Sequence, residues 1–301
     1  MKNLIVITGP TGVGKTKLCL DIAKHYSCEI INCDSRQIFK EIPIGTAAPT
    51  VAQQQLVRHY FVGTLDLDEY FSASMYEEQV CKLIEESRSE NFILSGGSMM
   101  YIDAVCNGID QLPTVRDDIR ELMKKRLECE GLDVLVKELQ ELDPEHWEVV
   151  DKKNPRRILH ALEICHQTSL PYSSFLKKEK NKRPFKVIKI GLIRPREELY
   201  ERINDRVLAM IEEGMVAEAQ KVYPMRHYNS LNTVGYKELF EYIDGNVSLD
   251  EAITKIQSNT RKYMRKQVTW FKRDQDIKWF NPSETKEIIK YIDCSLALGG
   301  K

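Results

Sequence analysis

The chain has 301 residues, of which 42% are hydrophobic and 30% are charged, and its formal net charge is −1. It is therefore long enough to bury a sizeable core, and its composition excludes an intrinsically disordered protein. Its eight cysteines form no Cys-x-x-Cys pair, which disfavours zinc ligands and a disulfide framework and favours thiols in a reducing compartment. No apolar run suits a signal peptide or a membrane span. We expect a soluble, cytoplasmic protein with no membrane partner.

The first predicted element is a strand over residues 4–7, and "TGPTGVGKT" follows it directly. Gly9, Gly14, Lys15 and Thr16 fit the pattern G-x-x-x-x-G-K-[ST], in which backbone N–H groups and a helix N-terminus hold phosphate oxygens. We expect Lys15 beside the phosphates and the Thr16 hydroxyl on a magnesium ion. The predicted phosphate contacts are Gly9, Pro10, Thr11, Gly12, Val13, Gly14, Lys15 and Thr16.

Strands and helices then alternate up to about residue 97. Apolar patterns predict a helix over residues 14–26, a strand over 28–35, a helix over 76–90 and a strand over 91–97. This alternation is typical of an α/β fold with a parallel sheet, whose ligands bind at the carboxyl ends of the strands. Residues 8–16, 34–37 and 96–98 fall at such ends, so we expect them to share one cleft.

The ends of these strands differ from those of a Walker-type ATPase. Such an ATPase supplies a magnesium ligand from an Asp that ends an apolar strand, whereas "NFIL" is followed here by Ser95, Gly96 and Gly97. The acid stands instead at Asp34, after the preceding strand. From the residue pattern alone, Asp34 is a metal ligand, a general base or a cap of the loop that follows it.

Only helical segments are predicted from residue 116 to about residue 180. Gly131 marks a helix end, Pro144 a break and Pro155 a helix start. Sheet character returns in "FKVIKIGLIRP". We therefore predict an all-helical domain at residues 113–184, inserted into a P-loop α/β core of residues 1–112 and 185–301.

Two further helices are predicted in the last third of the chain. The helix over residues 196–214 has an apolar stripe, and Arg202 and Arg206 point away from it, either toward the cleft or toward solvent. A long helix over residues 251–271 carries the basic run "NTRKYMRKQVTWFKR", in which aromatic residues are interleaved. Such a run suits contacts with nucleic-acid phosphates.

Several segments resemble one enzyme family. "CDSRQIFKEIPIGTAAP" resembles the D-S-x-Q-x-Y and I-G-T-A-K-P segment of the tRNA dimethylallyltransferases, also called tRNA isopentenyltransferases. "GPTGVGKT" is similar to their phosphate loop, "GGSMMY" to their G-G-T-x-x-Y, and "NPRRILHALEI" to their N-x-x-R-[IVL]-x-R-A-L-E helix. "TVGYKELFEYI" and "TRKYMRKQVTWFKR" resemble their V-G-Y-[RK] segment and their C-terminal signature. The resemblance implies a P-loop NTPase-like parallel sheet with an all-helical insertion and a helical C-terminal tail.

The resemblance implies an enzyme, a magnesium-dependent prenyltransferase. It would move a dimethylallyl group from dimethylallyl diphosphate to the exocyclic amine of the adenosine immediately 3′ of the tRNA anticodon. That amine is a poor nucleophile, so a carboxylate should accept its proton, and Asp34 is our candidate base. The allylic carbon gains positive charge as diphosphate leaves, so Lys15 and magnesium on Thr16 should lower the barrier. We expect a monomer that binds the anticodon stem-loop.

Further site residues follow from their positions in the family's motifs. Lys237 is expected to bind diphosphate, where the family often has Arg. The chain has Phe39, Ala48 and His160 where the family usually has Tyr, Lys and Arg. The expected tRNA contacts are Asp34, Ser35, Arg36, Gln37, Ser98, Arg120, Arg156, Arg157, Arg265, Lys266, Gln267 and Trp270.

Three alternative functions are weighed against this one. An adenylate isopentenyltransferase would use a free nucleotide as acceptor, but the helical insertion and the basic tail argue against it. A small-molecule P-loop kinase would use ATP, but the missing acid after "NFIL" and the tail disfavour it. A non-catalytic RNA-binding protein would not need Lys15, Thr16 and Asp34 intact.

Overall fold

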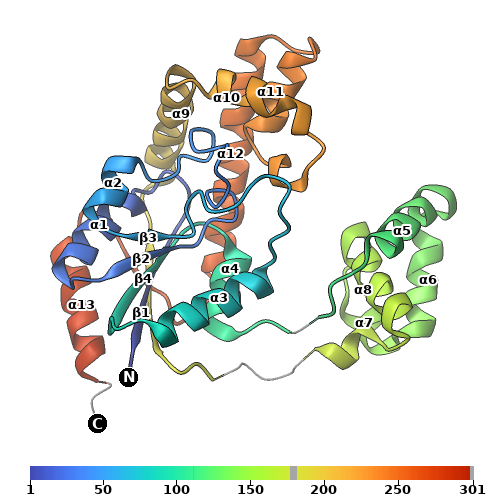
Figure 1. Ribbon diagram of the computed structural model, residues 1–301, viewed down its shortest axis with the longest axis horizontal. Helices are drawn as coiled ribbons and strands as arrows, with labels where there is room; N and C mark the ends of the chain where they lie inside the picture. The colour runs from blue at the N-terminus through green and yellow to red at the C-terminus, as the bar shows by residue number, and fades with distance from the viewer. Residues whose placement is uncertain (111, 177–181, 299–301) are drawn as a thin grey trace. The chain divides into compact units, whose positions relative to one another are not determined.

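The computed structural model of the protein describes residues 1–110, 112–176 and 182–298, and its chain divides into two compact units (Figure 1). The core unit comprises Met1–Asn107 and Arg183–Lys301, and the helical unit comprises Gly108–Lys182. These bounds lie a few residues from the expected ones. Within the described residues, no helix is both long enough and apolar enough to cross a membrane.

The core unit is built on a six-stranded parallel sheet with the strand order β3-β2-β4-β1-β5-β6. The strands are β1 Asn3–Thr8, β2 Glu29–Asn32, β3 His59–Tyr60, β4 Asn91–Ser95, β5 Lys186–Leu192 and β6 Lys278–Phe280. Strands β3 and β6 were not expected from the sequence, because strands of two and three residues are too short to show a periodic pattern. The order reverses between β4 and β1, which places the end of β1 at the switch point where ligands bind in such sheets.

Helices cover both faces of this sheet. The helices of the core unit are α1 Lys15–His25, α2 Val51–Leu56, α3 Ala73–Glu86, α4 Met99–Asn107, α9 Arg196–Glu212, α10 Met215–Val222, α11 Tyr236–Ile243, α12 Leu249–Phe271 and α13 Thr285–Ala297. Since side chains of a strand alternate between faces, Ile5 and Ile7 of β1 pack with α1, α9 and α13, whereas Leu4 and Val6 pack with α3 and α4. The long helix α12 contributes Met264 to the first of these cores and Phe271 to the second.

The helical unit contains α5 Asp117–Glu130, α6 Leu132–Leu142, α7 Pro144–Val149 and α8 Pro155–Thr168, with a short 3-10 helix, η1, at Tyr172–Phe175. Pro144 and Pro155 begin their helices at the position where a missing N–H costs nothing, and Asp143 and Asn154 cap the same ends. Met123, Leu135, Leu139, Ile158 and Leu162 form its separate buried core.

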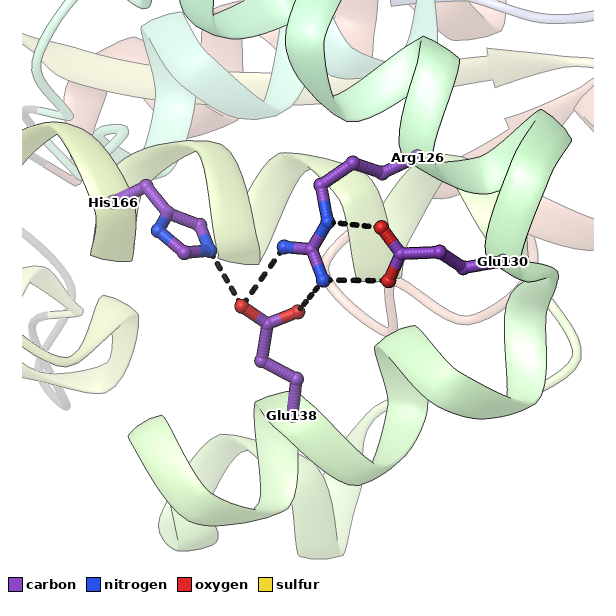
Figure 2. A network of polar contacts seen from close by, with 4 residues as sticks. All are labelled: Arg126, Glu130, Glu138 and His166. Atoms are coloured by element: carbon purple, nitrogen blue, oxygen red, sulfur yellow. Dashed lines mark hydrogen bonds and ion pairs between the residues drawn. The ribbon is translucent and has the colours of Figure 1, made fainter.

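A polar network ties α5, α6 and α8 together at the surface of that core (Figure 2). The Arg126 guanidinium forms ion pairs with Glu130 at 2.7 Å and with Glu138 at 2.9 Å. His166 Nε2 lies 2.7 Å from Glu138 Oε1. Because each helix supplies at least one member, the network fixes the positions of the three helices in addition to their apolar packing.

Candidate active site

The phosphate loop lies between β1 and α1, as predicted. A side chain on Gly9, which has φ 144°, would place Cβ 2.6 Å from the carbonyl oxygen of Leu192 in β5, so this position requires glycine. Lys15 Nζ donates to the carbonyl oxygens of Gly9 at 2.8 Å and Pro10 at 3.0 Å. The ammonium group is thereby held over the loop.

Three arginines surround the loop from the other side. Arg194 Nε, after β5, donates to Val13 O at 2.9 Å, and Arg202 Nε, on α9, donates to Gly12 O at 2.7 Å. Arg206 Nη1, one turn further along α9, donates to Thr11 Oγ1 at 3.2 Å. Arg202 and Arg206 therefore face the cleft, which decides between the two orientations that the sequence left open.

Arg194 was not among the site residues expected from the sequence. It directly follows Ile193 at the carboxyl end of β5. Because ligands of parallel sheets bind at such strand ends, this position could have identified Arg194 from the sequence.

The charges around the loop are partly buried and affect one another. Burial and the neighbouring Arg206 lower the pKa of Lys15 to about 8, and Asp34 opposes this shift. Burial also lowers the pKa of Arg206, and Asp34 again opposes the shift. A cluster of cations of this kind favours a multiply charged anion, which would relieve their repulsion.

Asp34 lies after β2 and its carboxylate organises the turn that follows. Oδ1 accepts hydrogen bonds from the backbone N–H groups of Arg36 at 2.9 Å and Gln37 at 3.4 Å. Oδ2 lies toward Gly97, 3.9 Å from the place that a Cβ on this glycine would occupy. Asp34 thus caps the turn with one oxygen, and it lies close enough to Lys15 and Arg206 for their charges to interact.

The segment after Asp34 is held by side chains that were expected to contact tRNA. Ser98 is only 9% exposed, and its Oγ accepts a hydrogen bond from Ser35 N at 2.8 Å. Gln37 Nε2 donates to the carbonyl oxygens of Thr46 at 3.0 Å and Ala47 at 3.1 Å. Ser98 and Gln37 therefore shape the segment from within the protein.

Two tyrosines that the sequence analysis did not single out border this segment. The charges of Arg36 and Asp34 act on both Tyr101, in α4, and Tyr263, in α12. Burial raises the pKa of Tyr263 to about 12, so its phenol stays protonated. Its hydroxyl donates to Gly97 O at 3.3 Å. Tyr263 lies within "TRKYMRKQVTWFKR", and the resemblance of that segment to the family's C-terminal signature could have identified it.

The tail on α12 divides into exposed and buried residues. Arg265 and Lys266 are exposed, as expected for phosphate contacts. Gln267, however, is 1% exposed and bonds to Thr11 and Gly97. Trp270 Nε1 donates to Asp103 Oδ2 at 3.0 Å, and its ring packs against the second core. The Gln267 amide is thus used inside the protein, which argues against its predicted direct contact with tRNA, whereas the predicted contact of the half-buried Trp270 stays a prediction.

Lys237 and the three departures from the family motifs lie apart from the phosphate loop's contacts. The Lys237 side chain is exposed on the first turn of α11, and none of the hydrogen bonds or ion pairs of the described residues joins it to the loop. Phe39 is buried in the core of α9 to α12, and His160 lies 3.5 Å from Glu163 in the helical unit. The expected diphosphate contact of Lys237 stays a prediction, with the neighbouring Tyr236 and Glu238 buried in α11.

The helical unit carries the remaining predicted tRNA contacts. Arg156 and Arg157 are exposed on the first turn of α8. Arg120 on α5 lies 3.8 Å from Asp117. Among the described residues, neither Arg156 nor Arg157 forms an ion pair with an acidic side chain, so their charge is available to a ligand.

Metal ligands supplied by the protein are few. Across residues 1–110, 112–176 and 182–298, no group of three or more His, Cys, Asp or Glu side chains could hold a metal ion. The Thr16 hydroxyl is exposed at the start of α1. Magnesium is commonly bound by one or two protein ligands, substrate phosphates and water, and the chain's donor set fits that mode.

Comparisons with known proteins agree with one another. The family model described as IPP transferase matches residues 37–274. The chain is 56% identical to tRNA dimethylallyltransferase 1 of Phocaeicola vulgatus over 292 residues, covering 96% of this chain and 97% of the relative. It is 54% identical to tRNA dimethylallyltransferase 1 of Bacteroides fragilis, covering 98% and 99%.

Solved structures are similar over nearly the whole chain. The full-length tRNA isopentenylpyrophosphate transferase of Bacillus halodurans matches with a TM-score of 0.73 and 33% identity, covering 99% of this chain and 97% of that one. A eukaryotic dimethylallyltransferase acting on tRNA matches with a TM-score of 0.81 and 25% identity, covering 94% and 74%.

Proposed function

The chain belongs to the IPP transferase family, and from this premise we propose that it is a tRNA dimethylallyltransferase. It transfers the dimethylallyl group of dimethylallyl diphosphate to the exocyclic amine of the adenosine 3′-adjacent to the tRNA anticodon and releases diphosphate. One observation carries the proposal furthest: the carboxylate of Asp34 interacts with the charges of Lys15 and Arg206 at a phosphate loop to which Arg194 and Arg202 also donate.

The phosphate loop would hold the leaving group. As the bond from the allylic carbon to oxygen breaks, its electron pair passes to diphosphate, and the carbon gains positive charge. Lys15, Arg202 and Arg206 stabilise the departing anion, and their present bonds to loop oxygens hold them at the place where it forms. Dimethylallyl diphosphate thereby suits the loop as well as ATP would.

Asp34 would act on the acceptor. The amine of an adenine is a weak nucleophile, so transfer is faster when a carboxylate takes its proton as the new carbon–nitrogen bond forms. Oδ1 is engaged by the N–H groups of Arg36 and Gln37, which fixes the orientation of the carboxylate. Oδ2, toward Gly97, is the oxygen placed to accept the proton.

An adenosine reaches such a cleft only when it leaves its stack. Tyr263, which is 38% exposed, and the guanidinium of Arg36 lie near Asp34 and offer planar surfaces for the extruded base. The burial that lowers the pKa of Arg36 indicates that this surface is partly shielded from water.

We propose magnesium as the metal ion, with the Thr16 hydroxyl as its protein ligand. Magnesium bound there would neutralise part of the charge on diphosphate. The protein's own contribution is the cationic loop described above, which binds and orients the donor.

The helical unit and the tail of α12 would hold the RNA backbone. Arg156 and Arg157 on α8, with Arg120 on α5, present cations on the helical unit. Arg265 and Lys266 present cations on the core unit. Phosphate contacts of this kind supply affinity and salt dependence, whereas contacts with base edges supply sequence selectivity.

The alternative functions fit less well. An enzyme that prenylates a free adenine nucleotide does not require a separate helical unit with exposed arginines. A kinase of the Walker type would place an acid at the end of β4, where Ser95, Gly96 and Gly97 stand.

The test is direct. The protein is incubated with radiolabelled dimethylallyl diphosphate, magnesium and tRNA that lacks the modification, with AMP as a competing acceptor. We expect label in tRNA and none in AMP. Label in AMP alone, or in neither acceptor, would overturn the proposal, and phosphate transfer from labelled ATP to a small molecule would support a kinase.

A further inference from the structure

Gln267 is a buried amide whose two ends are both bonded. Its Oε1 accepts a hydrogen bond from the backbone N–H of Thr11 at 2.9 Å, and its Nε2 donates to Gly97 O at 2.9 Å. The side chain is 1% exposed. Because both polar ends are satisfied by fixed backbone atoms, the amide has one orientation and is closed to direct contact with RNA.

The two backbone atoms that Gln267 joins belong to the two halves of the site. Thr11 lies in the phosphate loop. Gly97 lies beside the strand end that carries Asp34, because Ser98 N donates to Cys33 O at 3.1 Å and Ser98 Oγ accepts from Ser35 N. A displacement of Gly97 would therefore be passed on to Asp34 through these contacts.

A second linkage joins the same halves by a different route. Arg206 donates through Nη1 to Thr11 Oγ1 at 3.2 Å and through Nη2 to Thr46 O at 3.4 Å. Gln37 Nε2 donates to the same Thr46 oxygen, and Gln37 N donates to Asp34 Oδ1. These hydrogen bonds and the chain segments between them thus form a closed ring, to which α12 contributes Gln267, while Tyr263 of the same helix also donates to Gly97 O.

We infer that Gln267 is a positioning residue for the transfer, one that fixes the distance between the diphosphate-binding loop and the carboxylate of Asp34. This inference rests on the proposed function. Since a misplacement of about 1 Å between reacting groups can cost about 10²-fold in rate, loss of Gln267 should lower the rate of transfer much more than the affinity for either substrate.

The glycine at position 97 supports this role. A Cβ on Gly97 would lie 2.5 Å from Gln267 Nε2, closer than real Cβ contacts allow. Gly97 is thus the residue that lets the amide approach the backbone. Gly97→Ala should therefore reproduce the kinetic effect of changing Gln267, with that residue itself left in place.

Two substitutions at Gln267 separate positioning from structural support. Gln267→Met keeps the length and removes both hydrogen bonds. In Gln267→Glu, an ionised carboxylate still accepts from Thr11 N but opposes the carbonyl oxygen of Gly97. When the introduced carboxyl is protonated, it can donate to Gly97 O and restores the pattern of the amide.

The experiment measures the single-turnover rate of label transfer to tRNA between pH 5.5 and pH 8, together with the dissociation constants for tRNA and for dimethylallyl diphosphate. The rate of each variant is divided by that of the wild type at the same pH. The charged and titratable groups around the position are Asp34, Arg36 and Tyr263, with Lys15 and Arg206 at the loop. The wild type and the variant share all of these groups, so the ratio of their rates reports the titration of residue 267.

We expect Gln267→Met to transfer about 10²-fold more slowly at every pH, with dissociation constants within about threefold of the wild type. The ratio for Gln267→Glu should rise by about tenfold or more from pH 8 to pH 5.5, because a buried carboxyl protonates above its ordinary range. Gln257→Glu is the matched control, since Gln257 lies on the same helix and bonds to Asn204 O on α9. Its ratio should not change with pH.

Three results would overturn the inference. Equal losses of rate and of tRNA affinity would make Gln267 an RNA contact, and a flat ratio for Gln267→Glu would make its role merely structural. Wild-type rates in both Gln267 variants would show that Gln267 has no role in the transfer. If Gln267→Met does not fold, the pH dependence of Gln267→Glu and the rate of Gly97→Ala still test the positioning role of Gln267. If the wild-type protein transfers no label to tRNA, the proposed function itself is wrong.

Discussion

Two groups of cationic side chains, one at the phosphate loop of the core unit and one in the polar network of the helical unit, have different kinds of partner. In the core unit, Lys15, Arg202 and Arg206 bond to backbone or hydroxyl oxygens of the phosphate loop, and these neutral partners leave their charge available. In the helical unit, Arg126 is neutralised by Glu130 and Glu138. A cation held by neutral oxygens can serve a substrate anion, whereas one paired with carboxylates mainly stabilises the fold.

The largest expected effect distinguishes Lys15, which contacts the phosphate loop, from another lysine on the same helix. Lys15→Met should lower the rate of transfer to tRNA by about 10²- to 10³-fold, because one preorganised contact to the departing diphosphate is lost. Lys17→Met is the control, since Lys17 is exposed on the same helix. Single-turnover kinetics with labelled donor measure both. A similar loss in the two variants would show that the general charge of α1 matters and the loop contact does not.

The exposed arginines of the helical unit should affect binding and leave chemistry unchanged. Arg156→Ala combined with Arg157→Ala should weaken tRNA binding by about tenfold at physiological salt and make it less sensitive to salt, since two phosphate contacts are removed. The single-turnover rate at saturating tRNA should stay near that of the wild type. Filter binding over a series of salt concentrations measures this. An unchanged salt dependence would remove both arginines from the RNA interface.

The burial of Lys15 gives donor binding a dependence on pH. Its pKa is lowered to about 8 by burial and by Arg206, so the ammonium is charged below that pH and loses its proton above it. The affinity for dimethylallyl diphosphate should therefore fall by about tenfold between pH 7 and pH 9. Calorimetric titration at several pH values measures it, and Lys15→Met should lack this step. An affinity that is constant up to pH 9 would contradict the shifted pKa.

The smallest effect concerns the network of Figure 2. Glu138→Gln removes the ion pair with Arg126 and weakens the contact with His166, and should destabilise the helical unit by about 1 kcal/mol. Hydrogen exchange of amides in α6 and α8 measures this, with Glu128→Gln, an exposed substitution on α5, as the control. Transfer of label at saturating tRNA should be unchanged.

The same network has a pH dependence of known sign. Although burial opposes it, hydrogen bonds from Arg126 and His166 lower the pKa of Glu138. Its stabilising contribution is therefore present above the ordinary glutamate pKa and is lost as pH falls through the lowered value. Exchange protection of the α6 amides should therefore fall at acid pH in the wild type, and Glu138→Gln should lack this fall. Wild-type protection that stayed constant at acid pH would contradict the role of Glu138.

Local signals in the sequence were sufficient for the phosphate loop, the parallel sheet and the helical insertion. The loop pattern lies between an apolar strand and a helix, and each of these is specified by residues close in sequence. The orientation of Arg202 and Arg206 was not available from their helical phase, which shows only that they point away from the apolar stripe. Which neighbour they meet depends on the packing of α9 against the loop, a contact between residues far apart in sequence.

Gln267 shows a signal that was present and misread. It lies on the same face of α12 as the buried residues Met264 and Phe271, and a polar residue on an apolar face is usually one with buried partners. The partners themselves, Thr11 and Gly97, lie in distant segments. Lys237 differs, since its motif fixes a sequence position but not the direction of its exposed side chain on α11, and its diphosphate contact stays a prediction.

The most direct test of the account is the transfer rate of Asp34→Asn measured with its affinity for tRNA. The amide oxygen can still accept from Arg36 N and Gln37 N, so the turn should persist, but the side chain no longer accepts the proton of the amine. We predict a fall in single-turnover rate of about 10³-fold, with a tRNA dissociation constant within about threefold of the wild type. A rate near that of the wild type would contradict the role of Asp34 as base, and a parallel collapse of binding would make it a structural residue.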